Sequence, residues 1–195
     1  RDERLELLQL QTFHLKSQIQ VNEARFQAIF NQTFQFIGLL KPDGNLLEAN
    51  QTLLDFGGLH REEVIGLLLW QTPWWSVSIE AQICLQASVN RAAHGDFVRY
   101  EVDVVGADEQ TITIDFSLRP IADDRGIVMM IILEGRDISA RKQIEAELKE
   151  SQNHYANLAE ISPVGIFCTD FQGDCTYVNE RWCEMAGISP KEALG

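Results

Sequence analysis

The stretch IGLLKPDGNLLEANQTLLDFGG, residues 37–58, decides how the chain folds. Two short apolar runs, 36–40 and 46–49, flank the turn KPDG, and apolar runs around a turn that ends in glycine predict a β-hairpin. Asn50 follows the second run, at the place where an N-cap residue begins the next helix. The stretch therefore predicts a unit of strand, turn, strand and helix.

The same unit occurs twice. When the sequence is shifted by 129 positions, residues 25–66 align with residues 154–195 without a gap. The matched positions include the turn glycines, the N-cap asparagines and two further glycine pairs: Gly44 with Gly173, Asn50 with Asn179, Gly58 with Gly187, and Gly66 with Gly195. Glycines permit backbone conformations that other residues avoid, and the asparagines are suited to begin helices, so the repeat predicts two copies of one supersecondary unit. The second copy contains only the first third of the unit.

A heptad pattern precedes each copy. Before the first copy, a seam in steps of three and four contains Leu5, Leu8, Thr12, Leu15, Ile19, Asn22, Phe26 and Ile29. The matching seam before the second copy contains Arg141, Ile144, Leu148, Ser151, Tyr155 and Leu158. This spacing is typical of coiled coils, although a single amphipathic helix on its own domain is the alternative. We expect all of the first seam except Thr12 to form the interface of a parallel homodimer.

The region between the seams predicts mixed α+β structure. Residues 98–104 and 112–118 alternate apolar and polar side chains, as half-buried strands do. Every residue from Ile127 to Leu133 is apolar, which places this last strand at the centre of a sheet with both faces covered. We expect the N-terminal helix to pack on the back of that sheet.

The longest helix of this region is expected over residues 78–94. Ile79, Ile83 and Ala87 recur on one side of it, and Gly95 follows as a suitable end.

Composition and charge exclude several classes of protein. The chain has 195 residues, of which 45% are hydrophobic and 23% charged, as in globular proteins. Its net charge of −13 is unfavourable for binding nucleic acid. No apolar run approaches the roughly 20 residues of a membrane span, and the first residues do not form a secretory signal. We therefore expect a cytoplasmic protein without a membrane span.

Three motifs, in this order and spacing, resemble the PAS (Per-Arnt-Sim) sensor family. Residues 37–58 look like the opening hairpin and first helix of PAS domains. LLLWQTPWW, residues 67–75, resembles a tryptophan-rich segment of one bacterial PAS subfamily, and EGRDISARK, residues 134–142, is similar to the closing strand-to-helix motif. The resemblance implies an α+β PAS fold, with a five-stranded antiparallel sheet and flanking helices, preceded and followed by coiled-coil helices.

The resemblance also implies a division of the chain and a function. The expected parts are a dimerising helix (1–30), a PAS domain (31–137), a linker helix (138–158) and a truncated second PAS domain (159–195). PAS domains occur in tandem in sensor histidine kinases and diguanylate cyclases. We therefore expect a sensory module of a bacterial two-component protein, which relays a signal to an output domain outside this chain, with a histidine kinase as the expected output.

In the PAS family, the junction between the last strand and the following helix is thought to transmit the signal. The resemblance assigns this role to Asp137, Ile138, Ser139 and Arg141. Asp137 or Ser139 is also suited to cap the helix that begins near Ala140, and the two roles are compatible.

Catalytic and cofactor motifs are missing from the sequence. It contains no phosphate-binding loop, nucleophile elbow or HExxH motif, and its four histidines and four cysteines lack catalytic or metal-ligand spacing. We therefore expect neither an enzyme nor a metal site. Cys84 lies outside any flavin-binding motif and is expected to be a buried packing residue. His94, at the end of its helix, is expected to be solvated rather than to ligate haem.

PAS domains hold ligands between the long helix and the sheet, and the resemblance implies such a pocket here. Its candidate lining is almost wholly apolar: Tyr100, Ile112, Ile114, Phe116, Leu118 and Trp70. A pocket with so few polar groups is either empty or takes a small apolar ligand, so no cofactor is predicted. Trp70, Trp74 and Trp75 form either a lid or a plug, and their large buried area favours the plug.

Two other functions stay open at this point. One is a structural dimerisation spacer that binds no ligand. The other is a redox switch, because Cys168 and Cys175 are expected opposite each other on the second hairpin. The matching residues of the first copy are Leu39 and Leu46, which favours a packing role for both cysteines.

Overall fold

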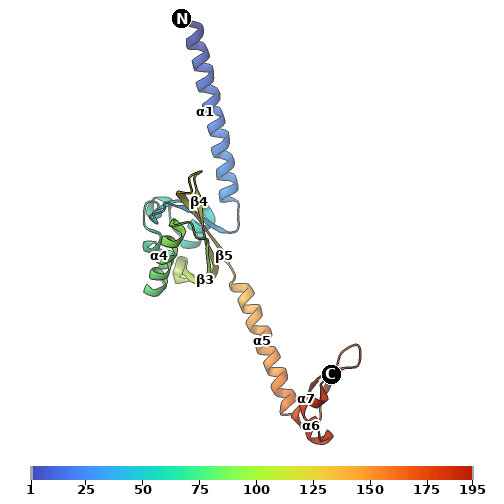
Figure 1. The fold of residues 1–195 in the computed structure, drawn as a ribbon. Helices are drawn as coiled ribbons and strands as arrows, with labels where there is room; N and C mark the ends of the chain where they lie inside the picture. Colours follow the sequence, from blue (N-terminus) through green and yellow to red (C-terminus); the bar gives the residue numbers. More distant parts are fainter. Residues whose placement is uncertain (1, 195) are drawn as a thin grey trace. The chain divides into compact units, whose positions relative to one another are not determined.

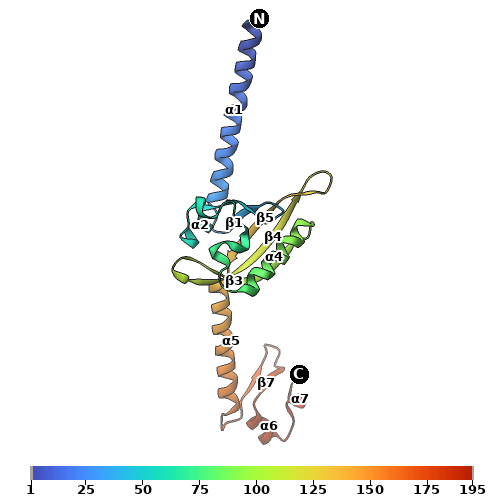
Figure 2. The same cartoon turned by 90° about the vertical axis from the view of Figure 1, so that its left-hand side faces the viewer.

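The computed structural model describes the backbone of residues 2–194 and the side chains of residues 13–194. It contains two compact units, which meet in the sequence between Ser139 and Ala140 (Figures 1 and 2). The helices of the first unit are α1 (Asp2–Asn31), α2 (Gln51–Gly57), α3 (Arg61–Val64) and α4 (Ile79–Ala93). Its strands are β1 (Phe36–Leu40), β2 (Leu46–Ala49), β3 (Val98–Val105), β4 (Thr111–Ala122) and β5 (Val128–Asp137).

The five strands form one antiparallel sheet in the order β2-β1-β5-β4-β3. The last strand, β5, lies at the centre between β1 and β4, as its apolar sequence predicts. Helix α4 covers one face of the sheet across β3, β4 and β5 (Figure 1). The predicted α+β fold with a five-stranded antiparallel sheet and flanking helices is therefore confirmed.

The core lies between α4 and the sheet. Leu85 of α4, Leu118 of β4 and Ile131 of β5 are completely buried. Two short 3-10 helices, Leu69–Gln71 and Pro73–Trp75, close one side of this core. Burial of these apolar side chains is the main source of the unit's stability.

The expectation that the N-terminal helix covers the back of the sheet is wrong. Every described α1 side chain from Phe13 to Ile29 is exposed, and Phe30, one residue before the end of the helix, is buried. The outward side chains of β5 are therefore only half-buried or exposed. Polar residues such as Asp115 and Glu134 share this face, which makes it tolerant of water.

The predicted apolar side of α4 also differs from the one that packs. Ile79 and Ile83 are 71% and 62% exposed, and Ala87 is exposed as well. The packed side carries Leu85, Ser88, Val89 and Ala92. Cys84 lies on the exposed side, so its expected role as a buried packing residue is wrong.

The second unit repeats the opening of the first. Its elements are α5 (Ser139–Glu160, which begins at the last residue of the first unit), β6 (Phe167–Thr169), β7 (Cys175–Val178), α6 (Glu180–Ala186) and α7 (Pro190–Ala193). Strands β6 and β7 form an antiparallel hairpin. The α5 side chains from Ala140 to Leu158 are exposed.

Cys168 and Cys175 do not face each other in this hairpin, contrary to expectation. Cys168 pairs with Tyr177 and Thr169 pairs with Cys175, with an irregularity between Cys168 and Thr169. Successive strand residues point to opposite faces, so the register separates the two thiols.

Among the described residues, no helix has the length and hydropathy that crossing a membrane requires.

Candidate functional site

The junction between β5 and α5 is anchored to β4. Ile138 is buried, and its amide donates to the carbonyl oxygen of Thr113 at 3.0 Å. The Thr113 amide in turn donates to the hydroxyl oxygen of Ser139 at 3.1 Å. The Asp137 carboxylate accepts from the Ser139 amide at 2.8 Å. The first residue of α5 is therefore held to the sheet from both sides.

Three of the four predicted junction residues take part in this arrangement. Arg141 lies two residues further on, where it is exposed and its guanidinium is 3.8 Å from the carboxylate of Glu145. Exposed pairs of this kind stabilise a helix weakly. Thr113, which completes the junction, has no sequence signal of its own, because it is one of several polar residues along β4.

A buried asparagine joins the entry of the first PAS-like unit to its hairpin. Asn50 is fully buried, and its side-chain oxygen accepts from the amides of Ile37 at 3.0 Å and Leu53 at 3.1 Å. Its side-chain nitrogen donates to the Gln35 carbonyl at 2.8 Å and to the Thr33 hydroxyl at 3.3 Å. One side chain thus binds the α1–β1 linker, β1 and α2 together.

The last residue of α1 and the linker after it are held to α2 by two more hydrogen bonds. The Asn31 side chain accepts from the Gln51 amide at 2.9 Å, and the Thr52 hydroxyl donates to the Thr33 carbonyl at 2.6 Å. The sequence marked Asn50 as a helix cap but did not reveal these contacts. The polar run at the end of α1 was the available signal.

Asn179 repeats this role in the second unit. Its side-chain oxygen accepts from Ile166 at 2.8 Å and Trp182 at 2.9 Å. Its side-chain nitrogen donates to the carbonyls of Val164 at 3.0 Å and Ala159 at 2.7 Å. Ala159 belongs to the last turn of α5. In this unit, therefore, the asparagine holds the end of the preceding helix directly.

The internal cavity of the first unit is small, and it lies between the sheet, α2 and the two 3-10 helices rather than under α4. Its volume is about 20 Å³, and its walls are apolar and aromatic. Of the predicted lining, Ile114 and Phe116 line it, whereas Ile112 and Leu118 are buried elsewhere in the core. A cavity of this size holds about one water molecule, whereas small-ligand pockets measure roughly 300–1,000 Å³. As shaped here, the cavity does not fit haem or a flavin.

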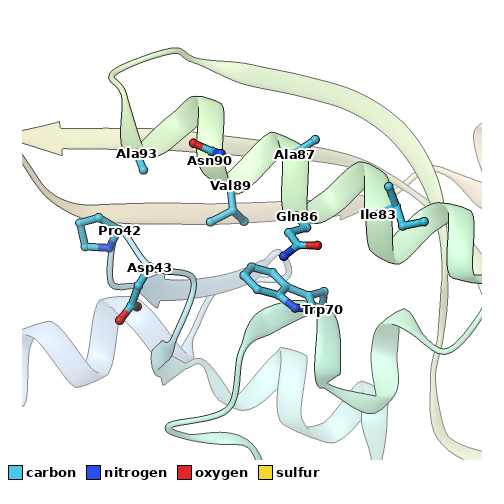
Figure 3. Close-up of a pocket in the computed structure, with 9 residues that line it drawn as sticks. All are labelled: Pro42, Asp43, Trp70, Ile83, Gln86, Ala87, Val89, Asn90 and Ala93. Carbon is cyan, nitrogen blue, oxygen red and sulfur yellow. The ribbon is translucent and has the colours of Figure 1, made fainter.

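The tryptophans divide between two places. Trp74 and Trp75 are buried beside the internal cavity, and Trp75 meets Phe116 edge to face at 5.1 Å between ring centroids. This arrangement agrees with the plug interpretation. Trp70 is only half-buried and lies against a separate surface groove (Figure 3).

Tyr100, also a predicted lining residue, packs edge to face on Phe116 at 5.5 Å. Its hydroxyl oxygen is buried, and among the described residues it makes no hydrogen bond of good geometry, although Ser88 and Cys84 lie beside it. Burial raises the pKa of Tyr100 to about 12. The hydroxyl therefore stays protonated at neutral pH.

The predicted dimer residues are accessible where the structure describes them. Leu15, Ile19, Asn22, Phe26 and Ile29 are exposed on α1. Leu5 and Leu8 lie outside the residues whose side chains are described. The dimer itself stays a prediction.

Comparison with family models connects this geometry to known proteins. Residues 30–143 match a model described as PAS fold, and residues 153–195 match a second one described as PAS domain. The chain belongs to the PAS family. Each of the two matched segments contains one copy of the unit of strand, turn, strand and helix.

Known relatives place these PAS segments among signalling proteins. The hybrid signal transduction histidine kinase D of Dictyostelium discoideum is 37% identical over 134 residues, which is 68% of this chain and 9% of that protein. The sensor histidine kinase TmoS of Ectopseudomonas mendocina is 35% identical over 134 residues, which is 68% of this chain and 14% of that protein. The chain thus spans a small part of the relatives it matches. It is a PAS sensory module similar to those of sensor histidine kinases.

Solved structures support the fold. The PAS domain of an HTR-like protein from Haloarcula marismortui aligns with a TM-score of 0.52 and 19% identity, over 64% of this chain and 98% of that chain. At this identity the likeness concerns the PAS fold alone.

Proposed function

We propose that this PAS module relays a signal from its first PAS domain, residues 31–137, through the linker helix α5 to an output domain, as a parallel homodimer. The observation that carries the proposal is the anchored junction of Thr113, Ile138 and Ser139. Two hydrogen bonds and a buried side chain fix the start of α5 to β4. A shift of the sheet is therefore expected to move the helix rather than only the loop before it.

The other end of α5 supports a relay to the next domain. Within the second unit, the Asn179 side chain holds the Ala159 carbonyl at 2.7 Å. The linker helix is thus fastened at its first residue within one unit and at its last turn within the other. A helix attached at both ends transmits a displacement better than a flexible linker does.

The apolar seams support a dimer. Besides those of α1, the α5 side chains Ile144, Leu148, Tyr155 and Leu158 are exposed at the predicted heptad spacing. Exposed apolar seams of this kind are buried in coiled coils. Polar seam residues, among them Asn22 and Ser151, weaken such packing and keep two arrangements close in energy. The relatives make a histidine kinase the expected output.

The relay is tested by measuring the distance between the two α5 helices of the dimer. A spin label is placed at Glu150→Cys in a chain whose native cysteines are serine, and the core is altered by Phe116→Leu. We expect the core substitution to shift the label-to-label distance distribution. Adding Ser139→Ala, which removes the acceptor of the Thr113 amide, should suppress the shift. Ser76→Ala, which removes one exposed hydrogen bond to the Pro73 carbonyl and lies outside the junction and both seams, is the matched control.

A second candidate function is a spacer that senses nothing, and the small size of the internal cavity favours it. The spacer predicts a dimer whose label distances do not respond to Phe116→Leu. A monomer in sedimentation equilibrium would contradict both proposals. The redox-switch hypothesis required Cys168 and Cys175 to lie opposite each other, and the register of the hairpin separates them.

The dimer has its own test. Replacing Asn22 by Leu removes a polar residue from the α1 seam, so the dissociation constant measured by sedimentation equilibrium should fall roughly tenfold. An unchanged constant would show that Asn22 does not lie in the interface.

A further inference from the structure

A groove on the surface of the first PAS domain has no role in the proposed relay. It lies between α4, the β1–β2 turn and Trp70, and Figure 3 shows its walls. Its volume is about 470 Å³, which falls in the range of small-ligand sites. We refer to it as the α4 groove.

The α4 groove is distinct from the internal cavity. The two share no lining residue, and α4 forms a wall of the groove but contributes no residue to the internal cavity. Ile83 and Ala87, from the apolar stripe that does not pack on the core, form part of its wall.

One wall of the groove is an aromatic ring in a fixed position. The six-membered ring of Trp70 packs over Gly44, where a Cβ atom would come within 2.4 Å of the indole Cζ3. The same Cβ position lies 3.4 Å from a methyl group of Val89. Gly44 thus lets the indole settle between the turn and α4, where Figure 3 shows it below Gln86. An aromatic face held in this way is ready to stack against a ligand.

Two amides line the groove without internal partners. In the part of the chain that the structure describes, the side chains of Gln86 and Asn90 make no hydrogen bond. Both are exposed and lie on α4. Each offers a donor and an acceptor to a molecule in the groove.

Asp43 is the ionisable residue among those that line the groove. Its Oδ1 accepts from the Asn45 amide at 3.0 Å, and this hydrogen bond lowers the pKa of Asp43 below its ordinary value of 3.8. The group is therefore negative at neutral pH. Lys41 lies close enough to interact with it, yet the chain as a whole carries a net charge of −13 and attracts cations.

We propose that the α4 groove binds a small organic cation, such as a quaternary ammonium or a protonated amine with an apolar substituent. The positive group is attracted by the face of Trp70 and, at longer range, by the Asp43 carboxylate, which Figure 3 shows directed away from α4, while the apolar part contacts Ile83 and Ala87. Gln86 and Asn90 supply hydrogen bonds to polar substituents. An anion would meet Asp43 without a cationic group in the lining to offset it.

The proposal is tested by titrating the isotope-labelled chain with benzyltrimethylammonium and following its amide and indole NMR signals. We expect saturable shifts at the Trp70 indole N–H and at the Gln86 and Asn90 side chains. Benzyl alcohol, the neutral probe, should bind roughly three- to tenfold more weakly, as expected for loss of the cation–π and charge attraction. Equal binding of both probes, or shifts confined to the internal core, would overturn the proposal.

Two variants sharpen the test. Asp43→Asn keeps an oxygen that accepts from the Asn45 amide, so the turn is preserved while the charge is lost, and cation binding should weaken roughly threefold or more. Ala87→Phe fills the groove from an exposed helical position and should abolish binding. If both variants bind the cation as the unaltered chain does, the groove is not its site.

Asp123→Asn is the matched control. Asp123 lies in the β4–β5 turn, where its Oδ1 accepts from the amides of Arg125 and Ile127 at 2.9 Å each, and it does not line the groove. Its substitution removes the same charge from the same kind of turn. Cation binding should therefore stay unchanged. If Asp123→Asn and Asp43→Asn weaken cation binding equally, the effect comes from the net charge of the chain and not from the position of Asp43.

Discussion

The two copies of the opening unit have the same backbone but different surroundings. The turn glycines have φ values of 92° and 96°, and the glycines that end α2 and α6 have φ values of 61° and 69°. Asn50 and Asn179 are both fully buried and make the same kind of contacts. In contrast, Leu46 is completely buried whereas the matching Cys175 is partly exposed.

This difference shows which features of the unit depend on nearby residues in the sequence and which depend on packing against other strands. In the first unit, β1 pairs with both β2 and β5, whereas within the described residues β6 pairs with β7 alone. The hairpin, the cap and the glycine turns are therefore set by neighbouring residues in the sequence. Pairing with the central strand β5 buries the side chains of the first hairpin, but the geometry of the hairpin, the cap and the turns does not depend on it.

The largest expected effect comes from removing the buried asparagine. Asn50→Ala loses a helix cap and leaves the partly buried amide of Ile37 without an acceptor. The first loss costs about 1 kcal/mol and the second about 1–3 kcal/mol, so the free energy of unfolding of the first unit should fall by about 3 kcal/mol. Urea denaturation followed by circular dichroism measures this change.

The same substitution in the second copy tests whether the two networks are equivalent. Asn179→Ala should speed hydrogen exchange at the amides of Ile166 and Trp182, which it leaves without acceptors. Asn31→Ala, which removes two exposed hydrogen bonds, to Gln51 and to Gln27, is the control and should cost about 1 kcal/mol or less. If Asn50→Ala lowers the free energy of unfolding no more than this control does, the hydrogen bonds of Asn50 do not hold the linker, β1 and α2 together.

The two turn glycines offer a sharper comparison. Both have positive φ, so an alanine costs about 1 kcal/mol at either position. A Cβ at Gly44 would also lie 2.4 Å from Trp70, whereas a Cβ at Gly173 would have no neighbour within 4 Å. Gly44→Ala should therefore destabilise its unit by about 2–3 kcal/mol and Gly173→Ala by about 1 kcal/mol.

Thermal denaturation of each variant, with exchange at β7 as the readout for the second unit, measures the difference. Trp70→Leu combined with Gly44→Ala provides the control, because the smaller side chain removes the clash and leaves the φ cost. If the two alanine variants lose equal stability, the contact between Trp70 and Gly44 does not constrain the turn.

Local patterns in the sequence account for what could be predicted. The turn glycines, Asn50 and the alternating strands act through adjacent residues, and the structure contains the elements expected from them. The central position of β5 followed from its apolar sequence. The junction at Asp137 and Ser139 was also visible, because its capping residues are local.

Properties that depend on packing between distant elements could not be predicted. Either side of α4 has enough apolar residues to pack, and the sheet selected Leu85 and Val89 over Ile79 and Ile83. The groove needs Asp43 and Asn90 to come together from segments far apart in the sequence. The register that separates Cys168 from Cys175 depends on an irregularity in the hairpin, which spacing alone does not reveal.

Tyr100 in the core and Tyr177 on the surface differ in how their ionisation at high pH is expected to affect stability. Burial raises the pKa of Tyr100 to about 12, and the pKa of Tyr177 is also raised, first by desolvation and then by its hydrogen bond to Glu160. Because the unfolded chain ionises Tyr100 near its ordinary value of 10, stability is complete below pH 10 and is lost as the pH rises toward 12. The loss should be about 1 kcal/mol once the solvent access of the half-buried ring is allowed for.

Tyr100→Phe isolates this contribution. The variant should be as stable as the parent at neutral pH, because the hydroxyl has no hydrogen bond of good geometry, and it should lose less stability between pH 10 and 12. Tyrosinate absorbance at 295 nm, compared with Tyr177→Phe, assigns the two titrations. If Tyr100→Phe and its parent respond equally to alkaline pH, Tyr100 does not titrate late.

The smallest expected effect concerns the short helices that follow each hairpin. The Glu63 carboxylate accepts from the His60 amide at 2.6 Å, and the matching Glu192 accepts from the Ser189 amide at 2.8 Å. Glu192 also accepts from the Ser189 hydroxyl at 2.7 Å. The backbone hydrogen bond first, and the hydroxyl second, lower the pKa of Glu192 below its ordinary value of 4.5.

A lowered pKa means that the cap of α7 is fully formed above pH 4.5 and is lost as the pH falls through the value of the folded state. The Ser189 amide signal in NMR should therefore shift with a midpoint below 4.5, and Glu192→Gln should abolish that shift. Ser189→Ala leaves one hydrogen bond, as in the pair of His60 and Glu63, and should move the midpoint back toward 4.5. If the midpoint stays unchanged in Ser189→Ala, the lowered pKa of Glu192 comes from the Ser189 backbone amide alone. The serine hydroxyl, which the first copy lacks because His60 occupies the matching position, would then not affect the cap.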